Sequence, residues 1–229
     1  MSQLFYGSTR AVFFDLDGTL VDTAPDMVSA LQDLQRDMGV EPVTYALGRS
    51  TVSNGAMGLL GLAFPEESIL PDGPLMCEFI ARYKNRVCVD SAVFPDLGPL
   101  LQSLDEASKP WGVVTNKPAH LTIPIMDQLQ LAQRSACIVS GDTLPTRKPD
   151  PATLIHACEL AQVAPEDCIY VGDAARDIEA GANAGMATIA VGYGYILESD
   201  DPQEWGADKY VASTQELVQT LRKAVNLDA

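Results

Sequence analysis

The sequence predicts an α/β protein, namely a Rossmann-like parallel sheet with helices on both faces and a small inserted α-helical cap. Three observations lead to this prediction. Short apolar runs recur along the chain, helical patterns separate them, and one interval between two runs is much longer than a single helix needs. Continuous apolar runs are typical of strands buried on both faces. Strands that alternate with helices are typical of a parallel sheet wrapped on both sides.

The expected strands are the short apolar runs that end in polar or acidic residues, and one further run after them. They are residues 11–15, 111–115, 136–140, 168–173 and 187–191. Between and after these strands, apolar residues at helical spacing predict helices near 97–104, 151–161 and 217–225. Pro151 suits the first turn of its helix.

The cap is predicted from the long interval between the first two strands. About 100 residues separate Asp15 from Thr115, whereas one strand with its helix needs about 30. Two apolar stripes at helical spacing, which begin at Met27 and Leu75, fill this interval. We therefore expect a core domain of residues 1–20 and 91–229 and a cap of residues 21–90.

Composition excludes several classes of partner. The net charge is −16, from 31 Asp and Glu against 15 Lys and Arg. Such a chain repels nucleic-acid phosphates and anionic lipid, so we expect no nucleic acid and no membrane as partner. The N-terminus lacks a signal-peptide pattern, and the odd number of cysteines, five, fits no closed disulfide framework, so the expected location is cytoplasmic. No oligomeric state follows from the pattern. An anionic substrate would need a local positive feature.

The strongest functional motif is FFDLDGTLVDT at 13–23, in which a buried strand delivers Asp15 and Asp17. Like charges raise each other's pKa, so two acids at a strand end indicate a bound cation. Carboxylate and carbonyl oxygens suit Mg²⁺. A simple turn or a loose Ca²⁺-type loop is the structural alternative.

Three weaker motifs follow. VVTNK at 113–117 ends a strand with Thr115 and Asn116, which could bind an anion or cap a helix. TRKPDP at 146–151 holds Lys148, either a fixed charge for phosphate or a solvated loop lysine. GDAARDIEAGANAG at 172–185 supplies Asp173, which could complete a metal site, and Asp177. Asp177 could hold the metal's waters, orient Lys148, or simply favour its helix's N-terminus.

The four motifs in this order resemble those of the haloacid-dehalogenase-like superfamily: D-x-D-x-T, a strand-end Ser/Thr, a Lys, and G-D-x-x-x-D. The resemblance covers essentially the whole chain, including the inserted cap. It implies that Asp15 is the nucleophile and forms an aspartyl-phosphate. It also implies that Asp17 is the general acid and base, in surroundings that favour its protonation. The remaining implied roles are phosphate binding by Thr115, Asn116 and Lys148, Mg²⁺ binding by Asp15, Asp17 and Asp173, and support by Asp177.

Within the superfamily that the chain resembles, dehalogenases do not keep a second acid in the first motif, so the presence of Asp17 implies ester hydrolysis or phosphoryl transfer. DLDGTLVDTAPD followed by a helical cap is similar to the phosphoglycolate phosphatase branch. Within that branch, the run from Gly192 to Asp208 is similar to the N-acetylmuramic acid 6-phosphate phosphatases. The resemblance implies a Mg²⁺-dependent phosphatase of a small phosphomonoester. A phosphomutase of the β-phosphoglucomutase type and a non-enzymatic binding or regulatory protein are the alternatives.

The cap segment 49–64 contains a small-residue turn that could meet the substrate's leaving group. We expect Arg49, Ser53 and Asn54 to be specificity contacts. The alternative is an ordinary turn between helices with a solvated arginine.

Overall fold

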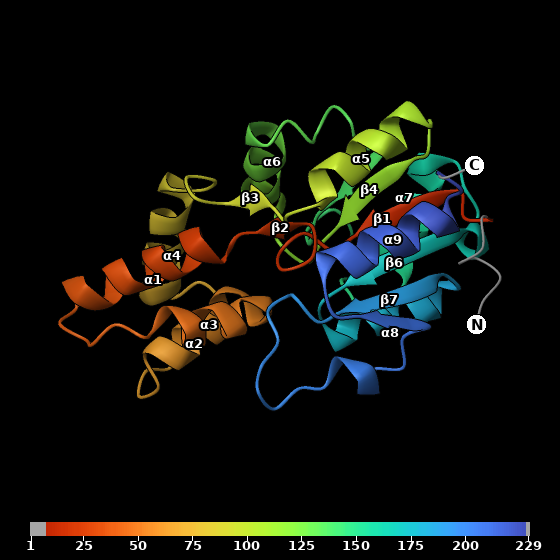
Figure 1. The fold of residues 1–229 in the computed structure, drawn as a ribbon. Coiled ribbons are helices and arrows are strands. Elements are labelled where there is room, and N and C mark those ends of the chain that lie inside the picture. Colours follow the sequence, from red (N-terminus) through yellow and green to blue (C-terminus); the bar gives the residue numbers. More distant parts are fainter. Residues whose placement is uncertain (1–7, 228–229) are drawn as a thin grey trace.

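The computed structural model describes residues 8–227. Figure 1 shows a sheet wrapped by helices and, to one side of it, a group of helices joined to it by β2 and β3. Six parallel strands form the sheet in the order β5-β4-β1-β6-β7-β8. Their bounds are β1 (Ala11–Phe14), β4 (Trp111–Val114), β5 (Cys137–Val139), β6 (Cys168–Gly172), β7 (Ala187–Val191) and β8 (Lys209–Val211). The predicted parallel α/β fold is confirmed, and β8 is an additional edge strand.

Helices cover both faces of the sheet. β1 shows why, because Val12 and Phe14 point into one hydrophobic cluster while Ala11 and Phe13 point into the other. The first cluster is covered by α5 (Leu97–Glu106), α6 (Ala119–Gln128) and α9 (Thr214–Ala224). The second is covered by α7 (Ala152–Ala161) and α8 (Ala175–Ala184).

The order of the strands places the site. β1 lies between β4 and β6, with Phe14 aligned to Val113 on one side and to Val171 on the other. After β1, the chain forms β4 and β5 on one side of this strand and then forms β6, β7 and β8 on its other side. Such a reversal leaves a crevice at the carboxyl ends of the central strands, where ligands bind in open α/β sheets.

The cap helices follow a short two-stranded connection. β2 (Val21–Asp22) pairs antiparallel with β3 (Ala92–Val93), so the chain leaves and re-enters the core at one place. Between them lie α1 (Ala24–Asp37), α2 (Tyr45–Thr51), the 3₁₀ turn η2 (Val52–Asn54), α3 (Gly55–Ala63) and α4 (Pro74–Asn85). We keep residues 21–90 as the proposed extent of the cap.

A loop of the core caps the first cap helix. The Tyr195 hydroxyl accepts hydrogen bonds from the main-chain N–H groups of Thr23 and Ala24, at 2.6 and 2.9 Å, and donates one to Asp22 at 2.7 Å. The first N–H groups of a helix have no partner within the helix. Tyr195 supplies that partner to α1 and so ties the cap to the loop after β7.

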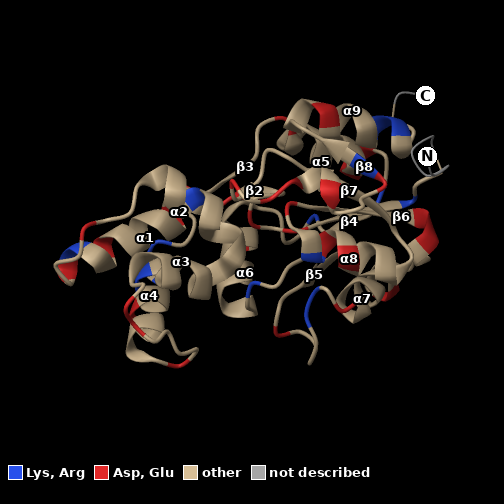
Figure 2. Ribbon diagram, turned by 90° about the horizontal axis from the view of Figure 1, so that it is seen from below, with Lys and Arg blue, Asp and Glu red and all other residues tan. Residues whose placement is uncertain are grey.

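Acidic residues occur in both parts of the molecule, as the red segments of the ribbon in Figure 2 show. Among residues 8–227, no helix combines the length and the apolar character that crossing a bilayer requires.

Candidate active site

The polar residues at the strand ends converge as expected. Asp15 follows β1, Thr115 follows β4 and Asp173 follows β6. All three are buried, with relative exposures of 4%, 3% and 1%. Parallel strands end at the same edge of the sheet, so motifs far apart in the chain meet there.

Lys148 is buried among these acids. Its ammonium lies 2.8 Å from Asp15 Oδ1 and 2.7 Å from Asp177 Oδ1. Burial by itself would lower the pKa of Lys148, but Asp15 and Asp177 raise it above its ordinary value. The ammonium therefore stays charged, and the alternative of a solvated loop lysine is excluded.

Two neighbours fix the position of Lys148. The Asn116 side chain accepts from the main-chain N–H of Lys148 and donates to its carbonyl, both at 3.0 Å. Asn116 thus holds Lys148, and its direct contact with phosphate stays a prediction. Tyr170 in β6 accepts from the ammonium at 2.7 Å and donates to the Val114 carbonyl at 2.7 Å. Tyr170 was not predicted from the sequence. The signal that could have identified it is a single hydroxyl group within an otherwise apolar strand.

Asp15, Asp173 and Asp177 form a buried acidic cluster, each offering one oxygen within 4.8 Å of the others. Lys148 compensates Asp15 and Asp177. Within residues 8–227, Asp173 Oδ2 instead accepts hydrogen bonds only from neutral donors, the Tyr195 N–H at 2.9 Å and the Ser53 hydroxyl at 2.8 Å. Burial, followed by the charges of Asp15 and Asp177, raises the pKa of Asp173 to about 7.

This imbalance fits a divalent cation. A metal ion beside Asp173 would supply the positive charge that its carboxylate lacks, and carboxylate oxygens are the ligands that Mg²⁺ prefers. Asp15 and Asp173 would hold it, and their roles as ligands stay predictions. Asp177 is paired with Lys148, as one of its expected roles requires. The contribution of the Asp17 main-chain carbonyl stays a prediction.

Two glycines let the main chain approach Asp173. Gly18 has a φ of +81°, which disfavours other residues. A Cβ atom on Gly18 would collide with the Asp173 carboxylate, and a Cβ atom on Gly194 would collide with the Cβ of Asp173. The loops after β1 and β7 therefore close tightly around Asp173.

Asp17 has surroundings that differ from the expectation. It accepts from the Thr23 hydroxyl at 2.5 Å and from the Lys117 ammonium at 2.8 Å. Both donors bond the same oxygen, Oδ1, and one of them is cationic, whereas we expected surroundings that favour the protonated acid. Lys117 was missed in the sequence, because nothing in VVTNK distinguishes a buried lysine from a solvated one.

A cavity of about 710 Å³ lies between the strand ends and the cap. Four of the chain's 15 lysines and arginines line it, namely Lys117, Arg147, Lys148 and Arg176. Asp15, Asp17 and Asp72 line the same cavity, so the four cations leave it with only a small excess of positive charge.

The three cap residues expected to set specificity are placed differently. Ser53 and Asn54 line the cavity. Arg49 instead donates to the Gly194 carbonyl at 3.1 Å, and its guanidinium lies 4.8 Å from the centre of the Tyr195 ring. Arg49 therefore ties α2 to the core, and the specificity roles stay predictions.

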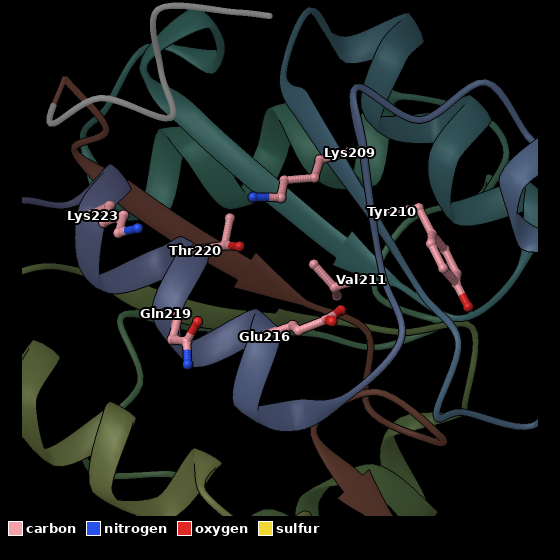
Figure 3. Close-up of a pocket in the computed structure, with 7 residues that line it drawn as sticks. All are labelled: Lys209, Tyr210, Val211, Glu216, Gln219, Thr220 and Lys223. Carbon is pink, nitrogen blue, oxygen red and sulfur yellow. The ribbon is translucent and has the colours of Figure 1, made fainter.

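A second, smaller pocket of about 170 Å³ lies between β8 and α9 (Figure 3). Its carboxylate, Glu216, already accepts from the main-chain N–H of Ala212. None of the strand-end acids lines this pocket, so we place the chemistry in the larger cavity.

Comparison with known proteins identifies the family. Residues 12–191 match the model of the haloacid dehalogenase-like hydrolases. The chain belongs to this family. A Pseudomonas putida protein named N-acetylmuramic acid 6-phosphate phosphatase is 42% identical to it, over 94% of this chain and 97% of its own. A Xanthomonas campestris pv. campestris protein named phosphoglycolate phosphatase is 41% identical, over 91% and 94%.

A solved structure agrees. The crystal structure of a predicted phosphoglycolate phosphatase from Haemophilus somnus 129PT superposes with a TM-score of 0.82 at 25% identity, covering 93% of this chain and 98% of its own. Together these relatives confirm the predicted family, the fold and the prediction of a phosphoric monoester hydrolase.

Proposed function

We propose that the protein is a Mg²⁺-dependent phosphatase that acts on a carboxylated sugar phosphate, with N-acetylmuramic acid 6-phosphate as the leading candidate, through an aspartyl-phosphate on Asp15. One observation carries the proposal: the Lys148 ammonium is held between Asp15 and Asp177, beside the uncompensated Asp173. This arrangement lets a carboxylate approach an anionic phosphate.

The size of the cavity supports a sugar phosphate over phosphoglycolate. At about 710 Å³, it falls in the range of about 300–1,000 Å³ that holds drug-sized ligands. A two-carbon acid would fill little of this space. Met27, Met76 and Ile80 add apolar lining that suits acyl substituents. Other relatives are named phosphoglycolate phosphatase, so phosphoglycolate is the second candidate substrate.

The first step transfers the phosphoryl group to the protein. An Asp15 oxygen forms a bond to phosphorus while the ester P–O bond breaks. A protonated Asp17 gives its proton to the leaving oxygen, which departs as an alcohol. Lys148 reduces the repulsion between Asp15 and the phosphate. When bound, Mg²⁺ would add charge stabilisation at the phosphoryl oxygens.

The second step releases phosphate. Water forms a bond to phosphorus and loses a proton to the Asp17 carboxylate, while the bond between phosphorus and Asp15 breaks. Asp15 returns as a free carboxylate, and Asp17 is again protonated for the next cycle.

The test is a phosphate-release screen over metabolite phosphates with Mg²⁺. We expect the highest kcat/KM for N-acetylmuramic acid 6-phosphate and no turnover by Asp15→Asn. Conversion of a sugar phosphate to an isomer without phosphate release would support the phosphomutase alternative. The non-enzymatic alternative is disfavoured because Asp15, Asp17, Lys148 and Asp173 are all present at one site.

We also propose the cytoplasm as the protein's location. All five cysteines are free thiols, and Cys137, Cys158 and Cys168 are buried. Unpaired thiols suit a reducing compartment.

A further inference from the structure

Lys117 contacts the core and the cap at the same time. Its ammonium donates to Asp17 Oδ1 at 2.8 Å. It also lies 3.8 Å from the Met27 sulfur in α1 and 4.7 Å from the centre of the Tyr83 ring in α4. Lys117 is only 8% exposed. None of the steps described so far uses this residue.

The main chain of Lys117 is fixed to the core. Its N–H donates to the Thr115 hydroxyl at 3.2 Å, and its carbonyl accepts from the Gly141 N–H at 2.8 Å and from the Thr122 hydroxyl at 3.0 Å. The ammonium end is therefore placed by a rigid base at the end of β4 and by the two cap helices around it.

The ammonium remains charged in this position. Burial by itself would lower the pKa of Lys117, but Asp17 and then Tyr83 raise it above its ordinary value. Asp17 supplies the opposite charge, and the Tyr83 ring face supplies a cation–π contact. A buried ammonium is costly without such partners, so removing either one would loosen Lys117.

The partners of Asp17 match one point of the proposed reaction. Thr23 and Lys117 both donate to its Oδ1, as a carboxylate requires. Asp17 is a carboxylate after it has protonated the leaving oxygen and before it takes a proton from water. This ion pair is the arrangement that the Asp17 carboxylate needs between the two steps.

We propose that Lys117 is a positioning residue for that step: it holds the Asp17 carboxylate in place to take a proton from the water that attacks the aspartyl-phosphate, and α1 and α4 hold Lys117 in turn. The inference rests on the proposed function. Lys117 keeps its own protons throughout; the water proton goes to Asp17 as the bond between phosphorus and Asp15 breaks.

The experiment compares Lys117→Met with the wild type in Mg²⁺, using p-nitrophenyl phosphate and a sugar 6-phosphate. General-base catalysis contributes roughly 10²–10⁴-fold, so we expect loss of positioning to lower kcat by about tenfold or more. The decrease in kcat should be similar for all substrates whose turnover is limited by the second step, because they pass through the same aspartyl-phosphate. Acid quenching followed by intact-mass measurement should show phosphorylated protein accumulating in the variant.

Further variants separate positioning from folding. Lys117→Arg keeps the charge and should retain more activity than Lys117→Met. Tyr83→Leu should accumulate phosphorylated protein to a smaller extent. Phe79→Leu, at a fully buried position of the same helix, and Lys84→Met, at an exposed one, are the matched controls and should not accumulate it. If Lys117→Met does not fold, Lys117→Arg and Tyr83→Leu carry the test.

Two results would overturn the inference. An unchanged kcat with a raised KM would make Lys117 a substrate-binding residue, and slower turnover without phosphorylated protein would place its effect in the first step. A wild-type protein that releases phosphate from no substrate would instead reject the proposed function.

Discussion

Lys148 shares its charge between two buried carboxylates, Asp15 and Asp177, and hydrogen-bonds to Tyr170 as well. A lysine in this position has two effects that can be measured separately. It reduces repulsion toward the substrate's phosphate, and it offsets the cost of burying two acids.

Replacing Lys148 by Met should therefore abolish turnover and also destabilise the protein. Removing one partner of a buried ion pair costs about 3–5 kcal/mol, because the remaining charge is left without compensation. Urea unfolding at pH 7 measures this loss, with exposed Lys84→Met as the control. An unchanged free energy of unfolding would mean that the acids do not depend on Lys148 for their burial.

Among the secondary-structure elements, the start of α1 depends on a residue that lies far away in the sequence. The Tyr195 hydroxyl bonds the N–H groups of Thr23 and Ala24 and the carboxylate of Asp22. The guanidinium of Arg49 packs over the same ring. The loop after β7 thus contacts Asp173 and also attaches the cap.

Tyr195→Phe should loosen the cap while leaving the sheet intact. The substitution leaves two buried N–H groups without their acceptor, at a cost of about 1–3 kcal/mol. Hydrogen exchange should become faster in the first turn of α1 and stay unchanged in β1 and β6. Tyr210→Phe, the same chemical change at a partly exposed tyrosine, is the control. Equal protection of α1 in both variants would contradict the capping role.

The elements also show what could be predicted from the sequence. Strands β1, β4 and β6 are continuous apolar runs, and parallel strands end at one edge, so the meeting of Asp15, Thr115 and Asp173 followed from local pattern. The last strand, β8, was missed because Lys209–Val211 is short and only partly buried.

Residues whose role depends on contacts between distant segments could not be predicted. The position of the Lys117 ammonium depends on its contacts with Asp17, Met27 and Tyr83. No local sequence pattern specifies which helices pack over a side chain. The same reason applies to Arg49, whose partners lie in a loop about 145 residues further along the chain.

For the whole molecule, the titration of Asp173 affects stability, and the proposed binding of Mg²⁺ would act on the same carboxylate. Burial first, and then Asp15 and Asp177, raise the pKa of Asp173 to about 7. The pKa of an aspartate in an unfolded chain is about 3.9. Between these values the folded protein keeps a proton that the unfolded chain has lost. Raising the pH through this window therefore lowers the free energy of unfolding, by at most about 1.4 kcal/mol per pH unit from this one group.

With a chelator present, the wild type should lose stability relative to Asp173→Asn as the pH rises from 5 to 7, because the amide does not titrate. Urea unfolding of both proteins across this range measures the difference, and a constant difference would contradict the raised pKa. With Asp173 as the proposed Mg²⁺ ligand, added Mg²⁺ should reverse the trend, because the metal binds the ionised carboxylate and competes with the proton. Saturating Mg²⁺ should therefore stabilise the wild type more at pH 8 than at pH 5, and should do so much less in Asp173→Asn.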